Sequence, residues 1–93
     1  MPHLQLKQLR QLIMVAEKGS IRQAAEALSI AQPALSRSIR SIEESLQVKL
    51  MNRGPRGIEL TEYGKTLVSY GKIIEANLRF ASEEIDELRG SKE

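Results

Sequence analysis

The sequence predicts a mainly α-helical fold, and two observations carry that prediction. Apolar residues recur at the helical spacings of three and four along most of the 93 residues. The exception is the segment 48–60, in which apolar residues partly alternate on either side of a loop rich in Gly and Pro. Together these patterns predict three short helices, a two-stranded hairpin and one long helix, in that order.

The composition limits what such a chain can be. Ninety-three residues suit one small domain, or one domain with an extended element, and a chain this short is marginally stable by itself, which favours dimerisation. With no Cys, disulfides and thiolate metal sites are excluded. No apolar run approaches the roughly 20 residues of a membrane-spanning helix, and the N-terminus lacks the apolar segment of a signal peptide. We therefore expect a cytoplasmic protein without membrane contact.

Charge is distributed unevenly along the chain. Residues 1–60 hold nine Lys or Arg against five acids, whereas residues 61–93 hold five against seven. A basic first part and an acidic second part fit a nucleic-acid-binding surface followed by a segment that does not touch the nucleic acid. The alternative is two solvated faces with a chance imbalance.

The first two helices are predicted at about residues 5–17 and from Ile21 to a turn at 29–31. Gly19 is placed to end the first helix in the left-handed conformation. Ser20 and Gln23 match a capping box at the start of the second. Within the second helix, Ala24 and Ala25 are small enough for the third helix to cross closely.

The third helix, predicted from Gln32 to about Leu46, has two different faces. One carries an apolar stripe: Leu35, Ile39, Ile42 and Leu46. The other presents Pro33, Ser36, Arg37 and Arg40. A helix held on one side and offering small polar and guanidinium groups on the other can lie in a DNA major groove. Residues 21–40 therefore predict a DNA-binding helix-turn-helix.

The segment 48–60 predicts a hairpin with a basic tip, the wing of a winged helix-turn-helix. Its strands are expected at 48–51 and 58–60, joined by a loop at 52–57. Two strands alone are barely stable, so their apolar residues should pack against the helices. We assign residues 1–61 to this winged domain of three helices and a two-stranded wing.

A long linker helix is predicted over residues 62–90, with Thr61 as its N-cap, Gly90 as its stop and a tail at 91–93. It would span about 40 Å at roughly 1.5 Å per residue, too long for this core to cover. Gly64 and Gly71 are most easily explained as points of close helix contact. A heptad seam favours a homodimer over a helix packed back on its own domain, and its members are Leu67, Gly71, Ile74, Leu78, Ala81, Ile85 and Leu88.

The stretch Ala31–Ile39 (AQPALSRSI), followed by Ile42 and Glu43, resembles the LysR-type transcriptional regulators. Arg53 with Arg56-Gly57, and Leu60–Gly64 (LTEYG), agree with that resemblance. It implies a winged helix-turn-helix with a dimerising linker helix, binding double-stranded operator DNA without a cofactor. The similar winged-helix domain of molybdate-responsive regulators is a close alternative to this family. The Leu60–Gly64 stretch leading into a long helix favours the LysR type.

In that family a larger effector-binding domain normally follows, and the full regulator is often a tetramer. We therefore expect this sequence to be the DNA-binding portion, with any small-molecule effector acting only through the missing domain. Three positions depart from the family pattern. Ala31 replaces Ser, so helix capping must come from Ser29 or Gln32; Gln47 replaces Gly after the third helix; and Met51 replaces Phe.

The resemblance also implies residue roles. The base-reading set comprises Gln32, Pro33, Ala34, Ser36 and Arg37. Arginine can donate two bonds to guanine, and glutamine can pair with adenine. For Arg37 the alternative is a surface ion pair with Glu44 or another acid, and for Gln32 it is helix capping.

Other positions are implied to contact the DNA backbone or the minor groove. The phosphate set comprises Ser20, Ile21, Arg22, Arg40 and Lys49. Arg56 at the wing tip is implied to enter the minor groove. Arg53 is expected either to join it or to bond a carbonyl or an acid at the base of the wing.

Two other classes of function compete with DNA binding. Catalysis is disfavoured because the single histidine, His3, lies at the terminus and no nucleophile, phosphate loop or carboxylate set appears. No catalytic or metal site is expected. A helical dimerisation or protein-interaction module without DNA binding would explain the long helix, but neither the basic wing nor the start of the third helix.

Overall fold

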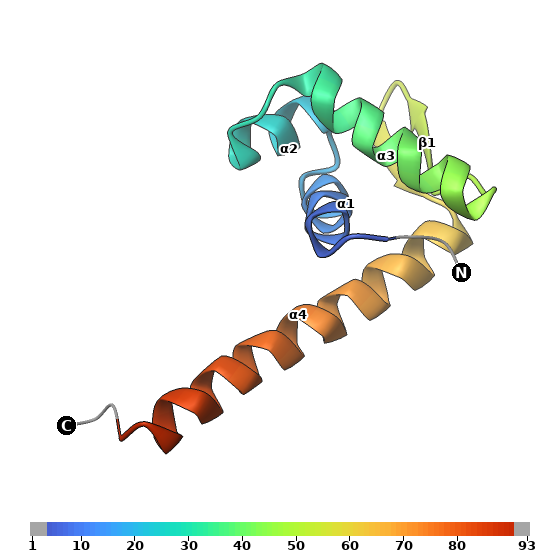
Figure 1. The fold of residues 1–93 in the computed structure, drawn as a ribbon. Coiled ribbons are helices and arrows are strands. Elements are labelled where there is room, and N and C mark those ends of the chain that lie inside the picture. The colour runs from blue at the N-terminus through green and yellow to red at the C-terminus, as the bar shows by residue number, and fades with distance from the viewer. Residues whose placement is uncertain (1–3, 91–93) are drawn as a thin grey trace.

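The structure is a computed structural model that describes residues 4–90. Its elements are α1 (Leu6–Lys18), α2 (Ile21–Leu28), α3 (Gln32–Leu46), β1 (Met51–Gly54), β2 (Gly57–Leu60) and α4 (Glu62–Leu88). The first three helices and the hairpin gather at one end, and α4 runs away from them as a rod (Figure 1), which gives extents of 52 × 30 × 20 Å. The predicted fold class is confirmed. The predicted tail at 91–93 and His3 lie outside the described residues.

The helix ends follow the local rules that the sequence indicated. Gly19 ends α1 at φ +68°, and its amide bonds to the Val15 carbonyl. The Ser20 hydroxyl accepts a bond from the Gln23 amide at 3.1 Å, but no return bond from Ser20 to the Gln23 side chain forms in the described chain. Thr61 caps α4 by accepting from the Gly64 amide at 3.2 Å.

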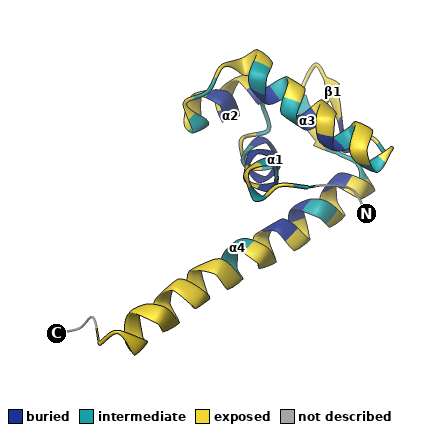
Figure 2. Ribbon diagram, in the orientation of Figure 1, coloured by how far each residue is buried: buried dark blue, intermediate teal, exposed yellow. Residues whose placement is uncertain are grey.

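The core lies where α1, α2 and α3 face one another and where the first turns of α4 cross α1. Figure 2 shows buried residues concentrated there, while the second half of α4 is exposed. The fully buried side chains with the largest volumes are Leu12, Leu35, Ile42, Leu50 and Val15. A modest aliphatic core of this kind is what the composition predicted.

The predicted hairpin forms, but its strands have different bounds from those predicted. β1 pairs antiparallel with β2 from Met51 opposite Leu60 to Gly54 opposite Gly57, so only Pro55 and Arg56 form the turn. The predicted strand at 48–50 is wrong, and so is most of the predicted loop at 52–57. The reason is a competition for backbone groups. The Leu50 carbonyl still accepts from the Thr61 amide at 3.0 Å, in register with the ladder, but the Leu50 amide donates to the Glu43 carboxylate at 2.8 Å. The Lys49 carbonyl accepts from the Thr61 hydroxyl at 2.6 Å instead of from a strand amide.

The beginning of α4 packs against its own domain through two glycines. A Cβ on Gly64 would lie 2.1 Å from the Leu50 carbonyl oxygen, and one on Gly71 would lie 3.2 Å from Ile13 Cδ1. Close contact at these glycines was predicted, but Gly71 was assigned to a dimer seam, and the structure buries it against α1 instead. Leu67 is likewise partly buried against the core. Of the predicted seam, Leu67 and Gly71 therefore pack against the chain's own domain. The later members, Ile74, Leu78, Ala81, Ile85 and Leu88, are exposed.

Candidate nucleic-acid interface

The outward face of α3 is exposed as predicted. Gln32, Pro33, Arg37 and Arg40 are exposed, and Ala34 and Ser36 are partly buried. The opposite face is fixed in the core, because Leu35, Ile39 and Ile42 are buried. The proposed alternative for Arg37 does not occur: the ion pairs of the described chain are Arg10–Glu75, Arg22–Glu26 and Arg89–Asp86. The outward face of α3 is therefore free of ion pairs within residues 4–90.

The turn between α2 and α3 sets the angle at which that face is presented. Ser29 adopts φ +58°, and the Ser29 and Ile30 amides bond to the carbonyls of Glu26 and Ala25, at 3.1 Å and 3.0 Å. This pair of bonds is the Schellman arrangement. Ile30 is partly buried against the core, so this residue of the turn points inward between the helices.

The start of α3 has no side-chain cap. Ala31 occupies the N-cap position without a side-chain bond, so the expected substitute cap from Ser29 or Gln32 is wrong. Pro33 in the first turn removes one amide that would need a partner. The Gln32 side chain takes no part in the described hydrogen bonds and is exposed, which removes capping as its role.

The end of α3 is closed by Gln47 rather than Gly. Gln47 adopts φ +57°, and both its amide and that of Val48 bond to the Glu43 carbonyl. A left-handed turn therefore forms at this position although Gln47 replaces the family's Gly. Such a conformation costs a side-chain-bearing residue about 1–2 kcal/mol.

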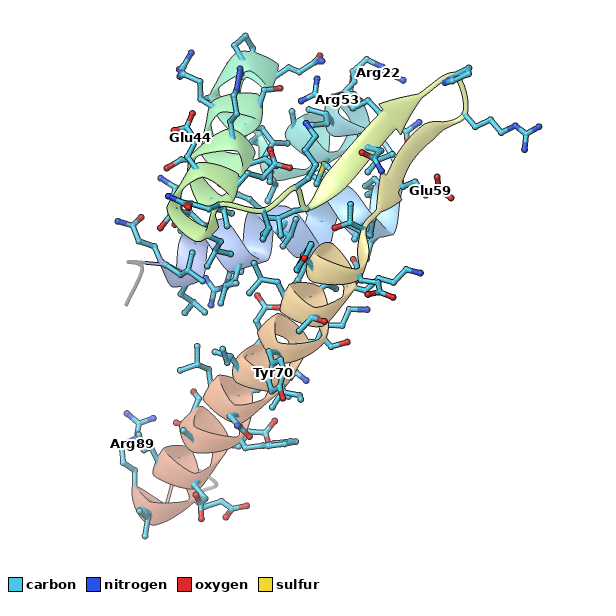
Figure 3. All side chains as sticks on the ribbon, turned by 90° about the vertical axis from the view of Figure 1, so that its right-hand side faces the viewer. Arg22, Glu44, Arg53, Glu59, Tyr70 and Arg89 are labelled. Atoms are coloured by element: carbon cyan, nitrogen blue, oxygen red, sulfur yellow. The ribbon has the colours of Figure 1, made fainter. Side chains whose placement is uncertain are left out.

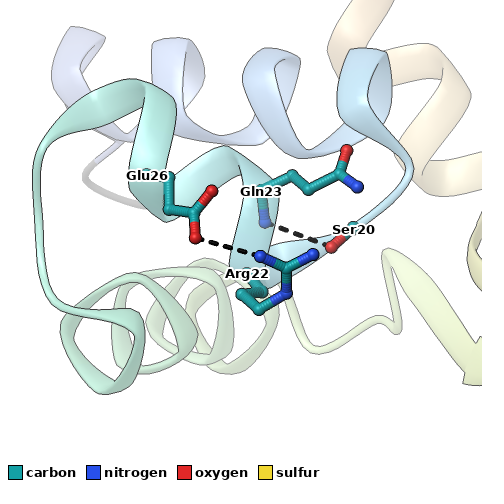
Figure 4. A network of polar contacts seen from close by, with 4 residues as sticks. All are labelled: Ser20, Arg22, Gln23 and Glu26. Atoms are coloured by element: carbon teal, nitrogen blue, oxygen red, sulfur yellow. Dashed lines mark hydrogen bonds and ion pairs between the residues drawn. The ribbon is translucent and has the colours of Figure 1, made fainter.

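The predicted phosphate-contacting residues at the start of α2 differ in what they offer. Ile21 is buried, so only its main chain can face a ligand. Arg22 is exposed and donates to Glu26 at 2.9 Å (Figure 4). Exposed pairs at this spacing contribute about 0.3–0.5 kcal/mol, so a phosphate can displace Glu26 from Arg22.

The two arginines of the wing lie in different positions, one in its turn and one beside α3. Arg56 lies in the exposed turn. Arg53, in β1, donates to the Ser36 hydroxyl at 3.4 Å, which is a long hydrogen bond. Within residues 4–90, the Arg53 guanidinium donates to neither a carbonyl nor an acid at the base of the wing, so that alternative is wrong. The wing therefore contacts α3 through Ser36, a member of the predicted base-reading set.

Two shallow grooves connect these elements. One lies between α3 and β1, and its basic lining residues are Arg40, Lys49 and Arg53. The other joins the starts of α2 and α3 to the wing, with Ser20, Arg22, Gln32 and Arg53 among its lining. Figure 3 shows Arg22 and Arg53 at this same end of the domain. The fold thus collects residues predicted separately as base, phosphate and wing contacts on one surface.

The wing is held to the α1–α2 turn by a main-chain contact that the sequence did not indicate. The Ile58 amide donates to the Gly19 carbonyl at 3.1 Å. A Cβ on Gly57, at φ +106°, would lie 2.6 Å from the Gly19 oxygen. Only glycine permits this approach, which places the wing against the start of α2.

Two further residues were missed as structural supports of the interface. Gln11 is 7% exposed, and its amide oxygen accepts from the Ser38 hydroxyl, which ties α1 to α3. Glu43 accepts from the Leu50 amide at 2.8 Å and ties α3 to the wing. No local pattern marks Gln11, whereas Glu43 lies within the family-like motif without an evident role there.

Within residues 4–90, no helix is long and apolar enough to cross a membrane. The same part of the chain contains no group of three or more His, Cys, Asp or Glu side chains that could hold a metal ion.

Three packed helices, an exposed third helix and a basic hairpin define a winged helix-turn-helix domain. Residues 6–65 match the family described as bacterial regulatory helix-turn-helix protein, lysR family, and the chain belongs to that family. It carries the family's DNA-binding domain.

Relatives of known name agree with this assignment. The SDS degradation transcriptional activation protein of a Pseudomonas species is 41% identical over 86 residues, which are 89% of this chain and 28% of that protein. A probable RuBisCO transcriptional regulator of a Nostoc species is 45% identical over 69 residues, 74% of this chain and 20% of that protein. The chain therefore spans less than a third of the length of these relatives.

Solved structures agree as well. The DNA-binding domain of BenM in complex with catB site 1 DNA matches with a TM-score of 0.87 and 32% identity, over 92% of this chain and 97% of that one. The CbnR DNA-binding domain in its DNA complex matches with a TM-score of 0.77 and 33% identity, over 97% and 100%.

Proposed function

We propose that this chain is the sequence-specific, double-stranded-DNA-binding part of a bacterial LysR-type transcriptional regulator. The observation that carries the proposal is α3, whose apolar face is buried while its opposite face is exposed and free of ion pairs. A rigid helix presented in this way fits the major groove. We divide the chain into a DNA-binding domain at 1–61 and a linker helix at 62–90.

Base reading is assigned to the exposed face of α3. Arg37 would donate two bonds to a guanine, and Gln32 would pair with an adenine. Pro33 and Ala34 would contact thymine methyl groups, and Ser36 would bond a base or a phosphate. The DNA complexes formed by the structurally similar BenM and CbnR domains support placing this surface on DNA.

Backbone and minor-groove contacts are assigned to the surface around that helix. Ser20, the main chain of Ile21, and Arg22 would bind one phosphate at the start of α2. Arg40 and Lys49, which line the groove between α3 and β1, would bind others. Arg56 would enter the minor groove from the wing turn, with Arg53 at the wing base beside Ser36.

We propose further that two copies pair through α4. Its second half exposes apolar side chains that its own domain cannot cover, from Ile74 at 40% to Leu88 at 87%. Ala81 and Ile85 complete this exposed part of the seam, and the partly buried Leu67 borders it. Scattered apolar residues on a surface are ordinary, but a row of them along one helix face fits a partner helix.

An antiparallel arrangement suits both the apolar pattern and the charge. Three pairs of apolar positions are symmetric about a point between 77 and 78, since 67 then faces 88, 70 faces 85 and 74 faces 81. A parallel pair would instead place the acidic segments 83–87 of two copies side by side. The antiparallel pair brings that segment opposite Lys72.

The antiparallel pair would also cover an apolar groove at the start of α4. This groove is lined by Leu46, Val48, Leu50, Tyr63, Thr66, Leu67 and Tyr70. Leu88 and Ile85 of the second copy would reach it from the far end of the partner helix. We assign no catalytic activity and no cofactor to the chain. As a regulator that binds the bacterial chromosome, it would act in the cytoplasm; a tetramer or an effector would depend on the rest of the regulator.

Selection of bound duplexes from a random DNA pool tests this function. We expect an inverted repeat, because two symmetry-related helices would read two half-sites. Binding of the selected duplex should weaken steeply with salt, with a slope of about 0.9 per neutralised phosphate in a plot of the logarithms. A protein-interaction module without DNA binding would enrich no sequence and show no salt-dependent association.

A further inference from the structure

Residues 47–50 form the connector between α3 and β1. Glu43, near the end of α3, accepts hydrogen bonds from two amides of this connector. Its carbonyl accepts from the Val48 amide at 3.2 Å, and its carboxylate accepts from the Leu50 amide at 2.8 Å. The side chain is partly buried and lies in the groove between α3 and β1. It forms none of the ion pairs in the described part of the chain, although Arg40 and Lys49 line the same groove.

The Leu50 amide, which Glu43 holds, is one of two anchors of the wing; the other is the Gly19 carbonyl, which accepts from the Ile58 amide at 3.1 Å. Leu50 is fully buried, and its carbonyl accepts from the Thr61 amide at the base of α4. The next residue, Met51, begins the ladder with Leu60, and the ladder continues to Gly54 opposite Gly57. A two-stranded hairpin with a two-residue turn has one register, so a shift of Leu50 is passed along the ladder to Arg56.

We propose that Glu43 is a positioning residue for DNA recognition. By holding the Leu50 amide, it fixes the distance and direction from the exposed face of α3 to Arg56. It thereby sets which minor-groove step the wing reads for a given placement of α3. This inference rests on the proposed function, in which α3 and Arg56 occupy different grooves.

The direction in which DNA affinity changes when the Glu43 carboxylate is removed distinguishes a positioning role from direct repulsion between Glu43 and phosphate. A carboxylate near DNA repels phosphate, so removing it should by itself strengthen binding, most at low salt. A positioning role predicts the opposite for the preferred site. Glu44 provides a matched control, because it carries the same charge one residue later, is exposed, and lies on the side of α3 away from the wing (Figure 3).

The first measurement needs no DNA. The chain contains no Cys, so Ser41→Cys on α3 and Arg56→Cys in the wing turn give two unique sites for spin labels. We expect a narrow distance distribution with Glu43 and with Glu43→Gln, whose amide oxygen can still accept from the Leu50 amide. Glu43→Ala should broaden or shift it, and Glu44→Ala should not. An unchanged distribution in Glu43→Ala would overturn the inference.

The second measurement compares affinities for two duplexes that share one selected core and differ in A·T-rich or G·C-rich flanks. Glu43→Ala should lose the flank preference to the extent that Arg56→Ala does, and it should cause no further loss in an Arg56→Ala background. Glu43→Gln should retain the preference. If Glu43→Gln behaves like Glu43→Ala, or the loss persists without Arg56, Glu43 does not act through the wing.

The two measurements also separate this inference from the proposed function. A distance change without any DNA binding would contradict the function and leave the positioning role standing. Should Glu43→Ala fail to fold, as judged by its thermal melt, Glu43→Asp makes the same comparison, since it keeps the charge and shortens the reach by one methylene group.

Discussion

Arg10 on α1 donates to Glu75 on α4 at 2.9 Å, and this ion pair lies where α4 leaves the domain. Gly71 and Val68 are buried one turn and two turns before it, and the later part of α4 is exposed. The pair therefore marks the end of the contact that fixes the direction of the linker helix. In the proposed dimer, the separation of the two winged domains would depend on that direction, because each domain lies at the end of its own α4.

Arg10→Ala should lower the free energy of unfolding by no more than about 1 kcal/mol, because the Arg10 side chain is 57% exposed and exposed pairs are weak. Urea denaturation measures this. Arg89→Ala, which breaks a pair near the end of α4, is the control and should have almost no effect. A loss above about 2 kcal/mol for Arg10→Ala would mean that the pair anchors α4 far more firmly than its exposure indicates.

Gln47→Gly should stabilise the domain by about 1 kcal/mol, because Gln47 holds a left-handed conformation that glycine adopts without strain. The same substitution inside a helix, Gln23→Gly in α2, should destabilise by a similar amount. Thermal melts of the two variants make the comparison. Destabilisation by Gln47→Gly would show that the Gln47 side chain contributes more than its backbone strain costs.

Single cysteines can report the direction of the α4 pair, because the chain has none of its own. In the antiparallel pair, Leu78→Cys lies near its symmetry mate and should crosslink under mild oxidation. Ile85→Cys should not, since its two copies would be separated by about 22 Å along the axis at about 1.5 Å per residue. Tyr70→Cys combined with Ile85→Cys should crosslink. Crosslinking of Ile85→Cys alone would indicate a parallel pair.

Arg56→Ala should weaken binding mainly on sites with A·T-rich flanks, because a narrow minor groove concentrates negative potential around an inserted arginine. Fluorescence anisotropy on matched A·T-rich and G·C-rich duplexes measures the difference. An equal loss on both would reduce Arg56 to a phosphate contact.

Features set by local chemistry could be predicted from the sequence. The α3 stripe, the cap at Thr61 and the stop at Gly19 depend on residues within one or two turns of each other, and all three are confirmed. The exposed face of α3 follows from its buried face, so its accessible side chains were also predictable.

Features that depend on residues far apart in the sequence could not be predicted. The first strand begins at Met51 rather than earlier because the Glu43 carboxylate takes the Leu50 amide and the Thr61 hydroxyl bonds to the Lys49 carbonyl. Gly71 fits a dimer seam equally well by spacing, and only the packing of Ile13 against it assigns it to the domain. Gln11 looks like an ordinary polar residue until Ser38 is found beside it. Periodicity gives the face of a helix but not what covers it.

The most direct test of the account is the affinity of Arg37→Ala for its selected site and for random DNA, with Arg40→Ala measured alongside. If α3 reads bases through Arg37, this variant should lose about 1–3 kcal/mol on the selected site, relax the preference at one base pair, and change little on random DNA. Arg40→Ala should weaken binding to both kinds of DNA alike. An Arg37→Ala variant that loses the same affinity on both would contradict the assignment of α3 to the major groove.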